Sequence, residues 1–358
     1  MKYNHLFLKL IKNKKKLTFQ KKMNTLSNSQ FIRKKPQIET IFTLETKTNL
    51  SNPREDLQGN LYVCSESGEI IKFNDEGENE TYLTLGGIPK SISFSSSSLY
   101  IADIANSVIY EKKSDNEDIN LLFKDYCESP LKGPTSIINI EENENINYII
   151  TSDAGYFGTS SLNNPKGSIF IYDLNNGILR PILLNCLAHP SDIYYDTLNG
   201  ILYICEMLNN RIIRVIQNPK GIFHSSVFYT FNGKIGPSAI TMDEIGNIYV
   251  ARYEFYDKNK KDNNGIISIL NKEGMLIGEI IVDDSCEING LLIPKLHKIQ
   301  DNDNNSNHTN LNGSNNENNT FSHLSNNCLY FTDKNFSGVK RIKLSQLAQE
   351  DEKNENKY

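Results

Sequence analysis

Six short stretches of this sequence share one strand-like pattern and decide the fold. They read GNLYV (59–63), SSLYIAD (97–103), INYIITSD (146–153), GILYICE (200–206), GNIYVAR (246–252) and NCLYFTD (327–333). Aligning their tyrosines gives spacings of 38, 48, 55, 46 and 81 residues, and the last spacing contains an Asn-rich insertion. Recurrence of one pattern at a period of roughly 50 residues indicates a repeat architecture.

Each stretch belongs to a unit of several short strands. A shorter apolar strand precedes it, such as KSISF (90–94), and another follows a Gly or Asn turn, such as GIISIL (265–270). Four short strands per unit, with turn residues between them, are typical of a propeller blade. The sequence therefore predicts an all-β, six-bladed propeller over residues 39–345. The sixth unit lacks an outermost strand, and we expect ETIFTLETK (39–47) to supply it and close the ring.

Three segments outside the repeats have distinct compositions. Residues 1–38 hold eleven Lys and Arg and no acidic residue, which suggests a disordered basic leader or an organellar transit segment. The protein is expected in the cytoplasm, or in an organelle if the leader directs it there. Residues 298–327 are an Asn-rich, low-complexity insert that we expect to be a disordered loop. Residues 346–358 form a charged tail.

Composition excludes several classes of function. The 358-residue chain has a net charge of −5, but from residue 39 onward it carries 27 basic and 43 acidic residues, which argues against binding nucleic-acid phosphates. No apolar run is long enough to span a membrane as a helix. The six cysteines include no CxxC pair and are interpreted as reduced thiols. We expect a small-molecule ligand, with a protein partner on the channel face as the alternative.

Ligands of a propeller bind where the innermost strands begin, at the mouth of the central channel. Prolines mark these starts here, because proline suits the first residue of a strand. They are Pro53, Pro89, Pro134, Pro190 and Pro237, with Asn289 in the sixth unit. Hydroxyl side chains beside them are candidates for substrate binding, namely Ser51, Ser91, Thr135, Ser191 and Ser238. They could bind a polyol, sugar or peptide, or simply satisfy backbone groups at the strand starts.

Two longer stretches carry a family resemblance. SDAGYFGTSSLNNPKGSIFIYDL (152–174) and HPSDIYYDTLNGILYICEMLNNRIIRV (189–215), with the ordered repeats, resemble the senescence marker protein, gluconolactonase and strictosidine-synthase-like superfamily of six-bladed propellers. The resemblance covers roughly residues 45–345. It implies a lactonase-type hydrolase holding one divalent cation, such as calcium or zinc, on a Glu, two Asn and an Asp at the inner strand starts.

This chain departs from the implied ligand set. The four ligand positions fall on Ser51, Thr135, Ser191 and Ser238. Neutral hydroxyls supply no formal charge, whereas a hard cation usually takes carboxylates. No residue is therefore assigned as a metal ligand and no cofactor is assigned. A divalent cation, calcium or zinc, stays the alternative, because a shift of register would bring Asp192 or Glu55 inward.

Three functions remain open from the sequence. The first is hydrolysis of a small lactone or ester by other groups, for which the catalytic candidates are Asp153, Glu206, Arg252 and His189, with Asp103 and Asp333 in equivalent places. A carboxylate there would act as general base on water, or would instead hydrogen-bond to neighbouring turns. The second is a non-catalytic propeller that binds a small molecule or protein. The third is a metal-independent, strictosidine-synthase-like enzyme.

The loop at residues 153–167 is long for a connection within a blade. It carries Tyr156 and Phe157, which we expect to cover the channel mouth and contact the ligand, while an ordered surface loop is the alternative.

Overall fold

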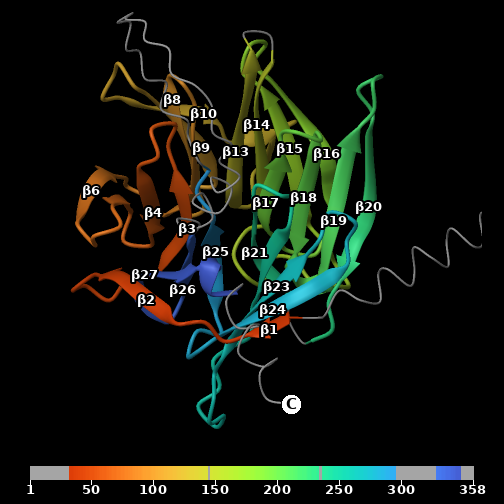
Figure 1. Ribbon diagram of the computed structural model, residues 1–358. Coiled ribbons are helices and arrows are strands. Elements are labelled where there is room, and N and C mark those ends of the chain that lie inside the picture. Colours follow the sequence, from red (N-terminus) through yellow and green to blue (C-terminus); the bar gives the residue numbers. More distant parts are fainter. Residues whose placement is uncertain (1–31, 144–145, 234–235, 296–327, 348–358) are drawn as a thin grey trace, which may run out of the picture.

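The computed structural model describes residues 32–143, 146–233, 236–295 and 328–347, whose strands form the predicted six-bladed propeller (Figure 1). Blades 1 to 3 are formed by β3 (Leu50–Glu55), β4 (Leu61–Ser65), β5 (Glu69–Phe73) and β6 (Asn79–Thr84); by β7 (Pro89–Phe94), β8 (Ser98–Asp103), β9 (Val108–Lys113) and β10 (Ile119–Phe123); and by β13 (Pro134–Asn143), β14 (Ile146–Asp153), β15 (Gly167–Asp173) and β16 (Ile178–Leu187).

Blades 4 to 6 complete the ring. They are formed by β17 (Pro190–Asp196), β18 (Ile201–Glu206), β19 (Arg211–Gln217) and β20 (Phe223–Thr230); by β21 (Pro237–Met242), β22 (Ile248–Arg252), β23 (Gly265–Leu270) and β24 (Leu276–Val282); and by β25 (Ile288–Leu292), β26 (Cys328–Asp333), β27 (Phe336–Lys343) and the N-terminal β2 (Ile38–Thr43). Short elements outside the blades are β11 (Asp125–Tyr126), β12 (Ser129–Pro130) and the 3₁₀ helices η1 (Met207–Asn209) and η4 (Leu344–Leu347).

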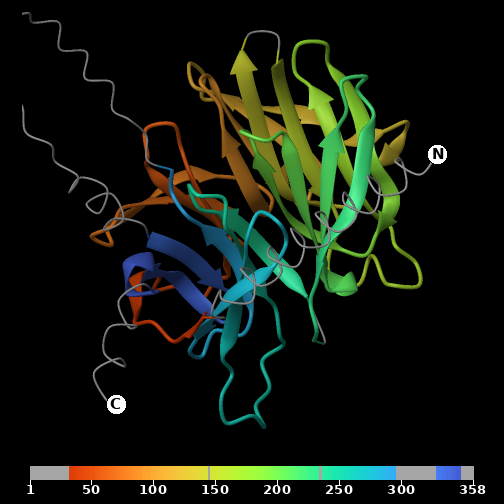
Figure 2. The same cartoon turned by 45° about the vertical axis from the view of Figure 1, so that its right-hand side comes forward.

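The N-terminal strand closes the ring as the sequence predicted. β2 pairs antiparallel with β27, from Ile38 opposite Ile342 to Thr43 opposite Gly338. Figure 2 shows this red strand beside the blue strands of blade 6. Pairing β2 with the last blade covers the edge that β27 would otherwise expose.

The predicted leader needs a correction at its end. Residues 32–34 were placed in the leader, but they form β1 (Ile32–Lys34), which pairs parallel with β24 as a fifth strand on blade 5. The free edge of β24 offers backbone hydrogen bonds to residues 32–34, which explains why they form a strand. The composition of the segment does not reveal such pairing. The rest of the leader up to residue 31, the insert at 298–327 and the tail from residue 348 lie outside the described residues.

Two details of the repeat alignment also differ from expectation. Proline begins the inner strand in blades 2 to 5, but Pro53 is the fourth residue of β3. Tyr148 is not aligned with the other tyrosines, because pairing of Pro134 with Asp153 puts Ile150 in the place that Tyr100 occupies in blade 2. Strands β13 and β14 of blade 3 are longer than their counterparts in blade 2. Aligning the sequence repeats on their tyrosines therefore placed blade 3 two residues out of register.

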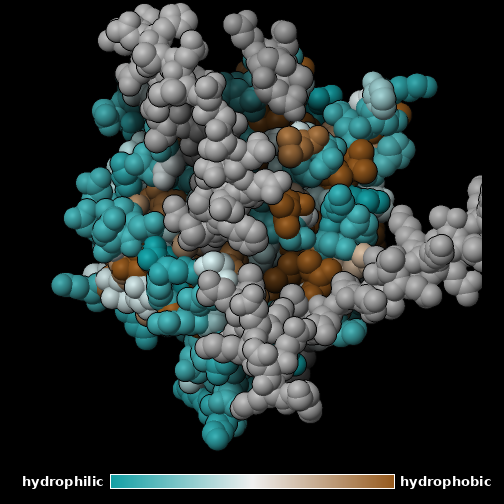
Figure 3. Space-filling view, in the orientation of Figure 1, coloured by the Kyte–Doolittle hydropathy of each residue, from teal (hydrophilic) through white to brown (hydrophobic). Residues whose placement is uncertain are grey.

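The hydrophobic core lies between the blades rather than in one central mass. Six buried clusters fill the six blade-to-blade contacts, and Phe331, Ile204 and Ile149 are among their fully buried side chains. Both faces of a blade are covered, so second strands such as β4 and β8 are buried along their whole length. The surface in Figure 3 is largely hydrophilic, with apolar side chains gathered in patches such as the one near β23.

Candidate functional site

One residue from each inner strand faces a cavity at the mouth of the channel. These six residues, called the mouth ring here, are Asn52, Lys90, Thr135, Ser191, Ser238 and Asn289. Five are the extra residue of a β-bulge directly after the first residue of the inner strand, and Asn52 lies in the corresponding bulge of β3. A bulge turns a side chain away from the alternating pleat, which explains why these positions reach the cavity. The cavity has a volume of about 400 Å³.

The hydroxyls of the mouth ring are committed to holding neighbouring blades together. Thr135 donates to the carbonyl oxygen of Pro190 over 2.9 Å, Ser191 to that of Pro237 over 3.0 Å, and Ser238 to that of Ile288 over 2.6 Å. Each acceptor belongs to the inner strand of the next blade, so the bonds run around the channel. Three of the residues predicted as candidates for substrate binding thus satisfy backbone acceptors of the neighbouring blade.

The two amides of the mouth ring continue the same pattern. Asn289 donates to the carbonyl oxygen of Leu50 over 2.9 Å, which joins blade 6 to blade 1. Asn52 donates to the carbonyl oxygens of Lys90 at 2.8 Å and Thr135 at 3.3 Å, and so reaches two blades. The side-chain oxygen of Asn52 is buried and has no hydrogen-bond partner in the described structure. A donor on a ligand could therefore satisfy it.

This ring does not fit the divalent cation that the family resemblance implies. Within the described residues, no three His, Cys, Asp or Glu side chains are grouped to hold a metal ion. Glu66 is the one carboxylate among the described residues that line the cavity, and its Oε1 lies 3.5 Å from the ammonium nitrogen of Lys90. A hard cation needs carboxylate oxygens, and an ammonium group in the ring repels it.

His189 lines the same cavity and is the one catalytic candidate from the sequence that does so. It is 7% exposed, and its Nδ1 is buried without a hydrogen-bond partner in the described structure. Burial, with a smaller contribution from the positive charge of Lys90, lowers the pKa of His189 to about 4. The imidazole is therefore neutral at pH 7 and can accept a proton.

Aromatic side chains from two loops form one wall of the cavity. Tyr156 and Phe157 follow β14, as predicted for the loop at 153–167, and Tyr253 and Phe255 follow β22. The ring of Phe157 lies 5.4 Å from that of His189 and 5.7 Å from that of Phe255, both edge to face. Phe157 and Phe255 are each 52% exposed, so this wall, called the aromatic wall here, leaves apolar surface open to a ligand.

An ion pair crosses the channel below the mouth ring. Arg54 on β3 lies 3.1 Å from the carboxylate of Asp192 on β17, and blades 1 and 4 are opposite one another in the ring. Asp192 is fully buried and also accepts hydrogen bonds from the Ser136 hydroxyl (2.7 Å) and the Ile240 amide (3.0 Å). Asp192 does point inward, but it is neutralised by Arg54 and forms the floor beneath the cavity.

The acidic candidates at the ends of the second strands do not line the cavity. Each accepts hydrogen bonds from the backbone just before the inner strand of its own blade. Asp153 accepts from the amides of Lys132 and Gly133, and Glu206 accepts from the amide of Ala188. Burial raises the pKa of Asp153, which Lys132 opposes. Asp103 and Asp333 do the same with the amides of Ile88 and Glu287, so an acidic residue at this position joins the strand ends in blades 2, 3, 4 and 6.

Arg252 occupies the equivalent position in blade 5 but turns outward from the channel. It donates to the carbonyl oxygen of Asn232, lies 3.7 Å from the carboxylate of Glu279, and places its guanidinium 5.4 Å from the ring centre of Phe231. These contacts hold the side chain between β24 of blade 5 and the end of blade 4. Arg252 is not among the residues that line the mouth cavity.

Two hydroxyl residues that the sequence predicted at the channel mouth lie one position away from it in the structure. Ser51 and Ser91 are buried and do not line the cavity, whereas their neighbours Asn52 and Lys90 do. The hydroxyl of Ser51 donates to the Lys90 carbonyl, and that of Ser91 accepts from the amide of Ile137. The bulge decides which residue faces the axis. A comparison of the residues directly after each strand-initial proline would have found Lys90.

Comparisons with known proteins agree with the fold. No protein-family model matches the chain. Lactonase drp35 of Staphylococcus haemolyticus is 27% identical over 123 residues, which are 33% of this chain and only 35% of that protein. A gluconolactonase of Xanthomonas campestris superimposes with a TM-score of 0.62 and 11% identity, over 86% of this chain and 89% of that one.

A calcium-binding regucalcin of Agrobacterium tumefaciens superimposes with a TM-score of 0.60 and 13% identity, over 87% of this chain and 95% of that one. Among the described residues, no helix is long and apolar enough to cross a membrane. The chain is therefore a six-bladed propeller with the fold of the gluconolactonase and regucalcin proteins, and about a third of its sequence is similar to a lactonase.

Proposed function

We propose that the mouth cavity hydrolyses a small lactone or ester without a bound metal ion. The observation that carries the proposal is His189, a buried and neutral imidazole whose Nδ1 has no partner in the described structure, in a cavity that also holds the Lys90 ammonium. The distant relationship to a lactonase supports the reaction class. The mouth ring does not fit a divalent cation, so no step depends on one.

The reaction needs a base and a positive charge near the carbonyl group. Nδ1 of His189 takes a proton from a water molecule as its oxygen attacks the carbonyl carbon. Lys90 stabilises the negative charge that develops on the carbonyl oxygen. When the tetrahedral intermediate collapses, the ester carbon–oxygen bond breaks and the imidazolium returns its proton to the leaving alkoxide. The products are an alcohol and a carboxylic acid that loses its proton to water, joined in one hydroxy acid when the substrate is a lactone.

The positive charge of Lys90 also explains part of the low pKa of His189. An imidazole with a pKa of about 4 is a weak base, and the cation compensates by lowering the energy of the oxyanion. The imidazole remains neutral until the pH falls through about 4. The proposal therefore expects hydrolysis to persist down to about pH 5 and to be lost near pH 4, whereas an ordinary histidine would lose it near pH 6.5.

The test is hydrolysis of dihydrocoumarin and phenyl acetate by the purified full chain, with EDTA and separately with added calcium or zinc. We expect turnover that EDTA does not change and that His189→Asn lowers by about 100-fold or more. Asparagine tolerates the positive φ of 58° at this position. The matched control is His224→Asn, because His224 lies exposed on β20 of the outer edge, and this variant should keep full activity.

Two results would overturn the proposal. Activity that EDTA abolishes and calcium restores would assign the reaction to a metal site. Absence of turnover in every condition would favour the second candidate, a propeller that binds a small molecule without reacting. The observation favouring that candidate is the aromatic wall, whose half-exposed Phe157 and Phe255 offer a ligand apolar surface and no reactive group.

A further inference from the structure

The mouth cavity has an uneven distribution of charge. Two positively charged residues, Lys90 and Lys334, line the cavity, whereas Glu66 is the one carboxylate among its described lining residues. Glu66 is 35% exposed at its side chain and Lys90 is 21% exposed, so water screens their 3.5 Å contact. Glu66 also accepts a hydrogen bond from Asn49 over 2.7 Å, which holds it at the rim. A partly exposed pair with a contact this long contributes little energy, and a ligand carboxylate can replace Glu66 beside Lys90.

Two residues that line the cavity each have a buried polar atom without a hydrogen-bond partner in the described structure. These atoms are the side-chain oxygen of Asn52, a residue that is 2% exposed, and Nδ1 of His189. Leaving buried polar groups unsatisfied is costly, and such groups usually find a partner in a ligand or in water. Both atoms can accept a hydrogen bond, so a ligand hydroxyl would satisfy them beside the ammonium of Lys90.

The aromatic wall supplies the third requirement of the ligand. Phe157 and Phe255 contact one another edge to face at 5.7 Å and remain half exposed. The ring centre of Tyr253 lies 5.5 Å from that of Phe255, and the two rings pack edge to face. A flat apolar ring packed against this wall would remove that surface from water. A purely polar sugar acid would leave it exposed.

From these three features we infer that the cavity binds monocarboxylates that carry an aromatic or alicyclic ring. The carboxylate lies at Lys90, the ring lies on the aromatic wall, and a hydroxyl group reaches Asn52 or His189. The inference deepens the proposed function and rests on the same site. It means that the substrates are lactones or esters of ring-bearing acids, and that the acid product stays bound at Lys90 as a competitive inhibitor.

Binding of three small probes to the full chain tests the inference without any turnover. The probes are 3-phenylpropionate, its uncharged amide, and acetate, titrated at pH 7 and low ionic strength by calorimetry or ligand-observed NMR. We expect the phenylpropionate to bind about tenfold or more tighter than either of the others, because only it has both the charge and the ring. Added salt should weaken its binding.

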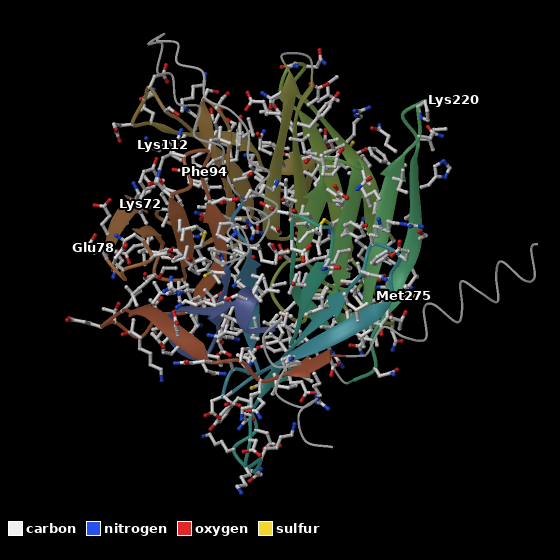
Figure 4. The ribbon with its side chains drawn as sticks, in the orientation of Figure 1. Lys72, Glu78, Phe94, Lys112, Lys220 and Met275 are labelled. Carbon is white, nitrogen blue, oxygen red and sulfur yellow. The ribbon has the colours of Figure 1, made fainter. Side chains whose placement is uncertain are left out.

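Variants identify the groups that bind. Lys90→Met should remove the preference for the acid over the amide, whereas Lys90→Arg should keep it. Lys220→Met is the matched control, since Lys220 lies exposed in the turn between β19 and β20 at the outer edge (Figure 4). Phe157→Ala should weaken binding of the phenylpropionate and leave that of acetate unchanged.

The outcomes separate this inference from the proposed function. Equal binding of the acid and the amide, or an acid preference that survives Lys90→Met, would overturn the inference even if hydrolysis is found. The same holds if none of the probes binds. Selective binding of the acid without hydrolysis of any ester would support the inference and contradict the proposed function.

Discussion

Replacing Asp192 with alanine should destabilise the propeller more than any change to a surface charge. Asp192 is fully buried and accepts hydrogen bonds from Arg54, Ser136 and Ile240, which belong to blades 1, 3 and 5. Removing one partner of a buried ion pair typically costs about 3–5 kcal/mol, because the other charge stays buried without compensation. The Ile240 amide and the Ser136 hydroxyl also lose an acceptor, at about 1–3 kcal/mol for each group that stays dry.

These costs overlap, so the expected loss is about 4–6 kcal/mol in the free energy of unfolding. Urea or guanidinium denaturation measures it, provided the slope with denaturant is unchanged between variants. The matched control is Asp283→Ala, which breaks the exposed pair in which Asp283 lies 2.8 Å from Lys35. That variant should lose less than about 1 kcal/mol.

A second variant keeps the reasoning testable if Asp192→Ala does not fold. Replacing both members, as Arg54→Met with Asp192→Leu, removes the two buried charges together and fills much of the space. It should be clearly more stable than Asp192→Ala, because the isolated guanidinium is gone. If Asp192→Ala costs no more than the surface control, or if the double variant is the less stable, the ion pair does not hold the channel floor as argued.

Three further predictions follow from the fold. Burial raises the pKa of Glu55 from 4.5 to about 7, so between these pH values the folded state binds a proton that the unfolded state has lost. The stabilisation from this proton is fully present below pH 4.5 and is lost as the pH rises through about 7. Glu55→Gln should therefore match the parent at pH 4 and exceed it by roughly 1–3 kcal/mol at pH 8 in denaturant melts, while equal differences at both pH values would contradict this. At Gly290 an added Cβ would lie 2.6 Å from Cδ of Pro53, so Gly290→Ala should cost about 1–3 kcal/mol in urea denaturation, and unchanged stability would show that β3 can shift. Removing residues 1–36 deletes β1, the one described strand in that segment, and should leave the melting temperature nearly unchanged. Removing residues 1–44 also deletes β2 with buried Phe42 and should lower the melting temperature by about 10 °C. Equal melting temperatures of the two truncated proteins would refute closure by β2.

The repeat was readable because each blade uses the same local pattern. Strands such as Ser98–Asp103 and Ile201–Glu206 are buried along their length, so the sequence shows uninterrupted apolar runs between polar turns. The pattern at 39–47 predicted closure of blade 6 for the same reason. Pairing of residues 32–34 with the edge of blade 5 was not predicted, because a three-residue strand carries almost no pattern of its own.

The site was harder to read than the fold. Of the four catalytic candidates, His189 lines the cavity, while the carboxylates of Asp153 and Glu206 accept backbone hydrogen bonds within their blades. An acid at the end of a buried strand looks the same in sequence whether it faces a ligand or a turn. Phe255 was not selected, since only the folded loops bring it beside Phe157.

By itself, the sequence determined the number of blades, the order of their strands and the way in which the ring closes. Those features depend on apolar periodicity and turn residues, which are local. The tertiary structure alone decided which residues face the channel. A single bulge moves Lys90 rather than Ser91 to the mouth, because one extra residue reverses the side to which each following side chain points. The pairing of Arg54 with Asp192 depends on two strands 138 residues apart meeting across the channel.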